Sequence, residues 1–162
     1  MKLSIIKGLS FGLASGIVTT LGLMVGLYSG TQSKIAVLGG ILTIAVADAM
    51  SDAFGIHLSE KAQSANKKKE IWESTFATFV AKLFFALTFI VPILLLELTR
   101  AVMASVVWGL FLLVIISIFI ADWRKESRLR MVAEHWGMAI TVVVLSYYLG
   151  VLIDRYFAGM IL

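Results

Sequence analysis

Apolar residues occur along this chain in five long runs that are separated by short polar stretches. The runs cover roughly residues 3–28, 35–57, 72–96, 101–121 and 131–154. A helix needs about 20 apolar residues to cross the hydrocarbon core of a bilayer, and each run meets that length. The pattern predicts an all-α polytopic membrane protein, with residues 1–162 forming a single transmembrane domain of five membrane-spanning helices.

The composition supports a lipid environment and excludes several kinds of chemistry. The chain is 60% hydrophobic and 15% charged, with a mean hydropathy of +0.97, which lies outside the range of soluble domains. Cysteine is absent, so disulfides and thiolate metal sites are excluded. The net charge of +4 comes from residues clustered between the apolar runs, so we expect no nucleic-acid partner. The lipid bilayer is the first partner that the sequence predicts.

The distribution of Lys and Arg predicts how the helices are oriented. Cytoplasmic loops of membrane proteins carry an excess of these residues. Of the 14 basic residues, ten lie on one side of the predicted spans and three on the other, while Lys82 lies within a span. The ten are Lys2, Lys7, Lys61, Lys67, Lys68, Lys69, Arg124, Lys125, Arg128 and Arg130. The N-terminus is therefore expected in the cytoplasm and the C-terminus outside.

Two carboxylates stand in the middle of the second apolar run. Asp48, Ser51 and Asp52 follow i, i+3, i+4 spacing, and Gly55 and Ser59 continue the same helical stripe. An Asp at a helix centre costs about 2.5–3.5 kcal/mol on insertion scales, and charged residues at this depth mark ion and proton pathways. We therefore expect this stripe to face the protein interior or an aqueous cavity.

Depth along the predicted helices places a lysine of the third span and a serine of the first near the level of Asp48. At 1.5 Å per residue, Asp48 and Lys82 each lie about 15 Å from the cytoplasmic ends of their helices, Asp52 about 9 Å and Ser15 about 18 Å. Asp48, Lys82 and Ser15 are expected to meet near the midplane, with Asp52 one turn closer to the cytoplasm. Lys82 is either a structural ion pair with Asp48 or a gate that releases Asp48 when a cation or proton takes its place.

Glycine recurs at every fourth position of the first helix, at Gly8, Gly12 and Gly16 and again at Gly22, Gly26 and Gly30. Small residues at this spacing let a neighbouring helix approach closely. The neighbour is either another helix of the same chain or a second copy of the protein, and the spacing alone leaves both open.

Three glutamates lie near the predicted cytoplasmic mouth. Glu60, Glu70 and Glu73 either attract cations toward the membrane or pair with the lysines around them in a solvated loop. No H-E-x-x-H or G-x-S-x-G motif is present, and we expect the protein not to be an enzyme.

Several segments resemble the vacuolar iron transporter family. Residues 12–20 are similar to the opening motif of its first helix, and residues 47–59 match its second-helix pattern in several places. Pro92 resembles the end of its third helix. The resemblance covers the whole chain and implies a homodimer that exports Fe²⁺ or Mn²⁺ from the cytoplasm in exchange for protons. It also implies a cation path near the dimer interface, lined by the first two helices.

The chain departs from that family at the residues that would bind the metal. Ser15 stands where the family usually has Asp, Asp52 where it has Met and Ile56 where it has Glu. Lys82 is an added charge, and the Glu-rich cytoplasmic segment of many members is absent. Exchanging a thioether for a carboxylate favours harder ions such as Mn²⁺, Mg²⁺ or Ca²⁺. Fast Fe²⁺ uptake that survives Asp52→Ala would contradict that hypothesis.

Two interpretations of function remain open at this point. In the first, the protein is a transporter that exports a divalent metal cation by proton exchange through Asp48, Asp52, Ser51 and Ser15, with no permanently bound cofactor. In the second, it is a structural or regulatory membrane protein whose metal site has degenerated. A prokaryotic plasma membrane is the expected location, because no targeting extension is visible in the sequence.

Overall fold

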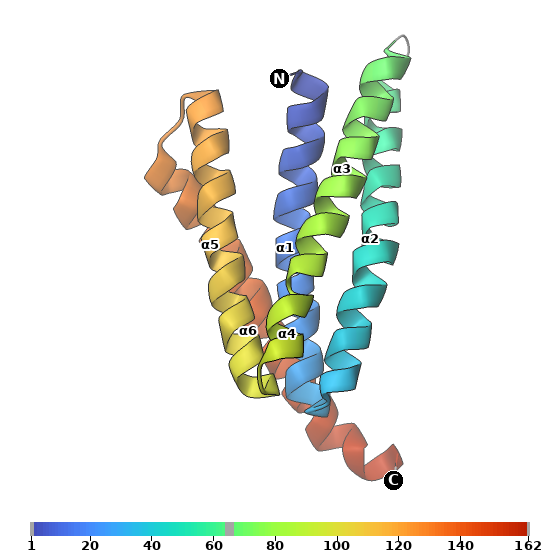
Figure 1. The fold of residues 1–162 in the computed structure, drawn as a ribbon, viewed down its shortest axis with the longest axis vertical. Helices are drawn as coiled ribbons and strands as arrows, with labels where there is room; N and C mark the ends of the chain where they lie inside the picture. Colours follow the sequence, from blue (N-terminus) through green and yellow to red (C-terminus); the bar gives the residue numbers. More distant parts are fainter. Residues whose placement is uncertain (1, 64–66, 162) are drawn as a thin grey trace.

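The computed structural model describes residues 2–63 and 67–161 of the chain, which form helices joined by short turns (Figure 1). The helices are α1 (Leu3–Thr31), α2 (Lys34–Gln63), α3 (Lys68–Thr88), α4 (Ile90–Leu95), α5 (Leu98–Arg124) and α6 (Arg128–Ile161).

Five helical segments are long and apolar enough to cross a membrane. They are Leu3–Thr31, Lys34–Gln63, Lys68–Leu95, Leu98–Arg124 and Arg128–Phe157. The predicted all-α fold with five spans is thus confirmed, and the protein is an integral membrane protein. Each segment begins or ends a few residues beyond the predicted span, because the helices continue into the polar residues that flank the apolar runs.

The third span is broken near its end by a proline. Pro92 has no backbone N–H, so the carbonyl of Thr88 lacks the donor that would continue the helix. The N–H of Phe89 instead bonds to the carbonyl of Ala86 at 3.2 Å, and α4 begins at Ile90. The Thr88 hydroxyl donates to Phe85 O and accepts from Trp108 Nε1 at 3.1 Å, which ties the break to α5.

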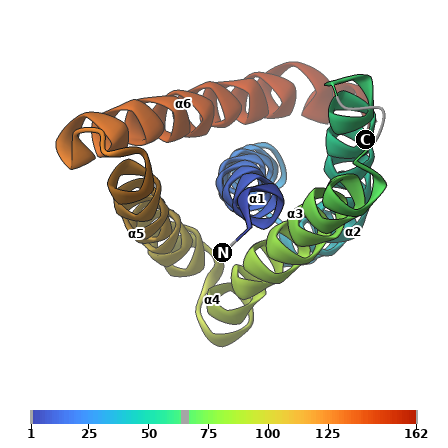
Figure 2. The ribbon, with the colours of Figure 1, turned by 90° about the horizontal axis from the view of Figure 1, so that it is seen from above.

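Helix α1 lies at the centre of the bundle, with the other helices around it (Figure 2). It packs most extensively against α3 and α6 and also contacts α2 and α5. Ile17, Leu21 and Met24 of α1 are completely buried and form the middle of the apolar core. A central helix must be apolar or small on every side, which explains why α1 combines large aliphatic residues with glycine.

The two glycine series of α1 pack against two different helices of the same chain. A Cβ at Gly8 would lie 2.3 Å from the Ser74 carbonyl oxygen, and one at Gly12 would lie 2.5 Å from that of Thr78, both on α3. Farther along, a Cβ at Gly22 would meet Val142 at 2.6 Å, and Gly26 and Gly30 face Ser146 and Gly150 of α6. The glycine spacing was compatible with close packing against another helix of the same chain or against a second copy. In the structure, the glycines pack against helices of the same chain.

Candidate cation site

The most deeply buried charge among the described residues is the ammonium group of Lys82 on α3. Its side chain is 1% exposed, and Nζ lies 2.6 Å from Oδ2 of Asp48. It also forms an ion pair and a hydrogen bond with Oδ2 of Asp52. The two carboxylates stand one turn apart on α2, so a single ammonium can contact both.

Ser15 of α1 completes the cluster. Its hydroxyl accepts a hydrogen bond from Lys82 Nζ at 2.9 Å and donates one to Oδ2 of Asp52 at 2.6 Å. Lys82 thus contacts both Asp48 and Ser15, as the depth estimate predicted. The hydroxyl of Ser15, however, bonds to Asp52, which that estimate had placed one turn closer to the cytoplasm. Three helices contribute to the cluster, since Ser15, the carboxylates and Lys82 come from α1, α2 and α3.

Gly16 makes room for the lysine. A Cβ at this position would lie 3.1 Å from Cγ of Lys82 and 3.2 Å from its Cα. The absence of a side chain on α1 thus lets the aliphatic stem of Lys82 pass between the helices and deliver the ammonium to α2. The glycine series and the charged cluster are parts of one arrangement.

The carboxylates are less enclosed than the ammonium. The side chain of Asp48 is 26% exposed and that of Asp52 is 21% exposed. Asp48 Oδ2 is close to Nζ, yet it forms no hydrogen bond of good geometry within the described residues. Among the described residues, Asp48 is held by its ion pair with Lys82, whereas Asp52 also accepts a hydrogen bond from Ser15. With all three groups ionised, the cluster carries one net negative charge.

A groove of about 680 Å³ opens beside Asp48. It runs between α1 and α2 from Ser51 and Asp48 toward the turn that joins the two helices, and most of its wall is apolar. The polar side chains in it are Thr19, Thr43, Asp48 and Ser51. Thr19 was not among the predicted site residues, although it stands one turn after Ser15 and donates to the Ser15 carbonyl at 2.8 Å.

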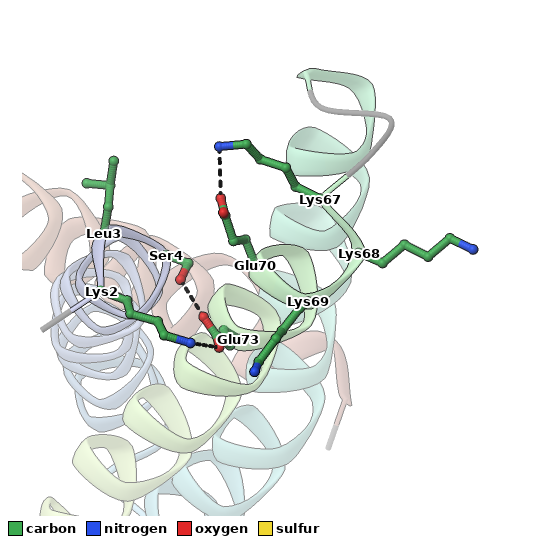
Figure 3. A pocket seen from close by; sticks show the side chains of 8 residues that line it. All are labelled: Lys2, Leu3, Ser4, Lys67, Lys68, Lys69, Glu70 and Glu73. Carbon is green, nitrogen blue, oxygen red and sulfur yellow. Dashed lines mark hydrogen bonds and ion pairs between the residues drawn. The ribbon is translucent and has the colours of Figure 1, made fainter.

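The glutamates at the predicted cytoplasmic mouth are paired with lysines. Lys7 Nζ lies 3.1 Å from Glu60 and Lys67 Nζ lies 3.2 Å from Glu70. Glu73 accepts from Lys2 at 2.6 Å and from the Ser4 hydroxyl at 2.8 Å (Figure 3). These contacts correspond to the salt-bridged alternative, and they tie the start of α1 to α3 and to the end of α2.

The donor set at the cluster is small for a metal ion. Within the described residues, no group of three or more His, Asp and Glu side chains could hold a metal. Asp48, Asp52 and Ser15 present only oxygen atoms, which suit hard cations more than soft ones. A divalent cation bound here would need further ligands from water or from a second protein chain.

Comparison with known proteins adds no identification, since no family model, curated protein or solved structure matches this chain.

Proposed function

We propose that this protein is a membrane transporter that exports a divalent metal cation of the Fe²⁺ or Mn²⁺ type from the cytoplasm in exchange for protons. Asp48 and Asp52 are its ligands, Ser15 and Ser51 supply hydroxyl oxygens, and Lys82 is a built-in competitor for the site. The observation that carries the proposal is the ammonium of Lys82, 1% exposed and held between both carboxylates.

A pocket that already holds a cation is the first argument for this function. Two carboxylates and a hydroxyl surround one positive group at the depth where the bilayer offers no water. Displacing a tethered ammonium exposes the same oxygens to a mobile cation. The partly exposed edge of Asp48, held without a well-aligned hydrogen bond, is where such a cation would first make contact.

The groove beside Asp48 supports a homodimer. A partly exposed carboxylate at lipid depth is unfavourable unless water or protein covers it. The walls of the groove are apolar apart from the carboxylate of Asp48 and three hydroxyl groups. In this proposal a second copy covers the groove, completes the ligand set and leaves a narrow wetted path to Asp48.

Export against an inside-negative potential requires a second ion. Moving one charge across 100 mV takes about 2.3 kcal/mol, and a divalent cation carries two charges. Exchange for protons supplies that energy, and a carboxylate pair is a type of site that binds either protons or a metal.

The proposal is tested by metal flux into proteoliposomes with a pH difference across the membrane. We expect Asp48→Asn and Asp52→Asn to abolish Mn²⁺ and Fe²⁺ flux while the protein stays folded. Asp154→Asn, an exposed carboxylate on α6, is the matched control and should transport normally. Flux that persists with its pH dependence in both site variants would refute the mechanism.

A second candidate function is a structural or regulatory membrane protein. It is favoured by the same lysine, because both carboxylates are already neutralised in part by an internal partner. Metal-dependent thermal stabilisation in detergent separates the two, since a ligand that binds the folded state raises its apparent stability. No stabilisation by Fe²⁺, Mn²⁺, Co²⁺, Zn²⁺, Mg²⁺ or Ca²⁺ would favour this second function.

A further inference from the structure

A second groove lies between α2 and α3 and has a volume of about 350 Å³. Its residues on α2 are Met50, Ala53, Phe54 and His57, and those on α3 are Trp72, Thr75, Phe76 and Phe79. Asp48 and Ser51 line the groove described above instead. The α2–α3 groove is therefore separate from the candidate cation site and from the face proposed for the dimer.

The polarity of this groove changes along its length. At its upper part, His57 Nδ1 lies 3.2 Å from the Thr75 hydroxyl, and the His57 ring packs on Trp72 with centroids 4.7 Å apart. Its deeper part is formed by Met50 and Phe54 of α2 and by Phe76 and Phe79 of α3. Amphipathic groups thus precede purely apolar ones, as at the boundary between headgroups and acyl chains.

A lysine continues each wall of the groove beyond its polar end. On α3, Lys68 precedes Trp72 by four residues, and on α2 Lys61 follows His57 by four, so each shares a face with the groove residues. Figure 3 shows the Lys68 side chain pointing away from Lys67 and Lys69. Both Lys61 and Lys68 are exposed, and neither forms an ion pair within residues 2–63 and 67–161.

The spacing of these groups matches the dimensions of a lipid. At 1.5 Å per residue, Trp72 lies about 6 Å below Lys68, Phe76 about 12 Å and Phe79 about 16 Å. Along the groove, positive charge is followed by hydrogen-bonding groups and then by an apolar channel. A phospholipid presents its phosphate, ester groups and acyl chains in the corresponding order. We propose that the α2–α3 groove binds one anionic phospholipid, with its phosphate at Lys61 and Lys68 and one acyl chain against Phe76 and Phe79.

A second copy of the chain is a poorer occupant for this face. A two-fold interface places the same patch of both copies in contact, and it would bring Lys61 and Lys68 of one copy toward the same lysines of the other. Like charges facing each other disfavour such an interface. An anionic headgroup has the complementary charge, and the lysine-rich end of the bundle is the end at which the charge distribution predicts the cytoplasmic leaflet.

The test is native mass spectrometry of the full chain in detergent with equal amounts of phosphatidylglycerol and phosphatidylcholine that carry the same acyl chains. We expect a preference of about fivefold or more for phosphatidylglycerol. The Lys61→Gln/Lys68→Gln variant should lose that preference. Lys67→Gln/Lys69→Gln removes the same charge from neighbouring positions on the other side of α3 and should keep it.

A second measurement reports where the acyl chain lies. Phosphatidylglycerol brominated on its acyl chain should quench the tryptophan fluorescence of the wild type. Part of this quenching should be lost in Lys61→Gln/Lys68→Gln, and Trp72→Phe should remove most of that same part. Equal retention of both lipids would overturn the proposal, as would an equal loss in the control variant. Complete displacement by inorganic phosphate would indicate a free-anion site instead. A lipid-free dimer that shields Trp72 would assign this face to a second copy.

Discussion

The hydroxyl of Ser15 donates to Oδ2 of Asp52 over 2.6 Å and joins the central helix to the helix that carries both carboxylates. The same oxygen accepts from Lys82 at 2.9 Å. A carboxylate in place of Ser15 would therefore stand beside Asp52 and the ammonium of Lys82. The oxygen set of the cluster depends on this one position of α1.

Ser15→Asp should convert the cluster into a stronger metal site. A third carboxylate raises the charge of the ligand set, and we expect Mn²⁺ to stabilise the variant at a concentration about tenfold lower than the wild type needs. The measurement is the unfolding temperature in detergent as Mn²⁺ is added. Ser59→Asp adds the same charge at an exposed position two turns from Asp52, and an equal gain in that control would contradict the role of Ser15.

Lys82→Met should destabilise the protein strongly. Removing one member of a buried ion pair leaves its partners uncompensated, which costs about 3–5 kcal/mol, and here two carboxylates lose their shared cation. The triple variant Asp48→Asn/Asp52→Asn/Lys82→Met carries no charge at the site and should recover a large part of the loss. Thermal unfolding in detergent measures the stability of the single and of the triple variant. A single variant as stable as the wild type would mean that the ammonium is not needed to hold α2 and α3 together.

Gly12→Ala should weaken the contact between α1 and α3. The new Cβ would lie 2.5 Å from the carbonyl oxygen of Thr78, a backbone atom that cannot move aside without shifting the helix. Overpacking of this kind costs about 1–3 kcal/mol. Gly39→Ala is the control, because a Cβ at Gly39 has no atom within 4 Å among the described residues, and it should leave stability unchanged or raise it slightly. Both are compared by chemical or thermal unfolding.

Ser117 and Ser105 of α5 offer a matched pair of buried hydroxyls. Ser117 lies 2.6 Å from His135 Nδ1 and also donates to the Leu113 carbonyl. Because a hydroxyl has one hydrogen, His135 must donate from Nδ1, and Ser117→Ala leaves that donor unpaired at a cost of about 1–3 kcal/mol.

The Ser105 hydroxyl is equally buried and has no hydrogen-bond partner within the described residues. Ser105→Ala should therefore be neutral or stabilising. The test compares the unfolding temperatures of Ser117→Ala and Ser105→Ala, and only that of Ser117→Ala should fall. Equal losses would show that the contact between Ser117 and His135 adds nothing to the pairing of α5 with α6.

The five spans and the charged cluster could be predicted because both follow from distances along single helices. Hydrocarbon thickness sets the length of each apolar run, and a fixed rise per residue brought Asp48, Lys82 and Ser15 to one level. The polar residues that extend α2 to Gln63 and that begin α6 at Arg128 carry no such signal. Helix ends beyond the hydrocarbon depend on loop geometry, which apolar patterning does not encode.

The partners of each helix face were less accessible to sequence reasoning. Glycine spacing indicated that α1 has close neighbours. It could not predict that the series beginning at Gly8 packs against α3 and the series beginning at Gly22 against α6. The break at Phe89 was not predicted, although Pro92 was a visible signal for it. The third span itself was predicted to reach residue 96, and it runs to Leu95. The groove beside Asp48 depends on how side chains of two helices fit, which a one-dimensional pattern does not describe.

The central position of α1 has a consequence for biosynthesis. This helix is synthesised before α3 and α6, yet its two glycine-lined sides pack against those two helices. Until α6 has been translated, one side of α1 must therefore face lipid or an insertion factor. The packing around α1 is completed only when α6 is in place, so a truncation that removes α6 should leave α1 a target for membrane quality control.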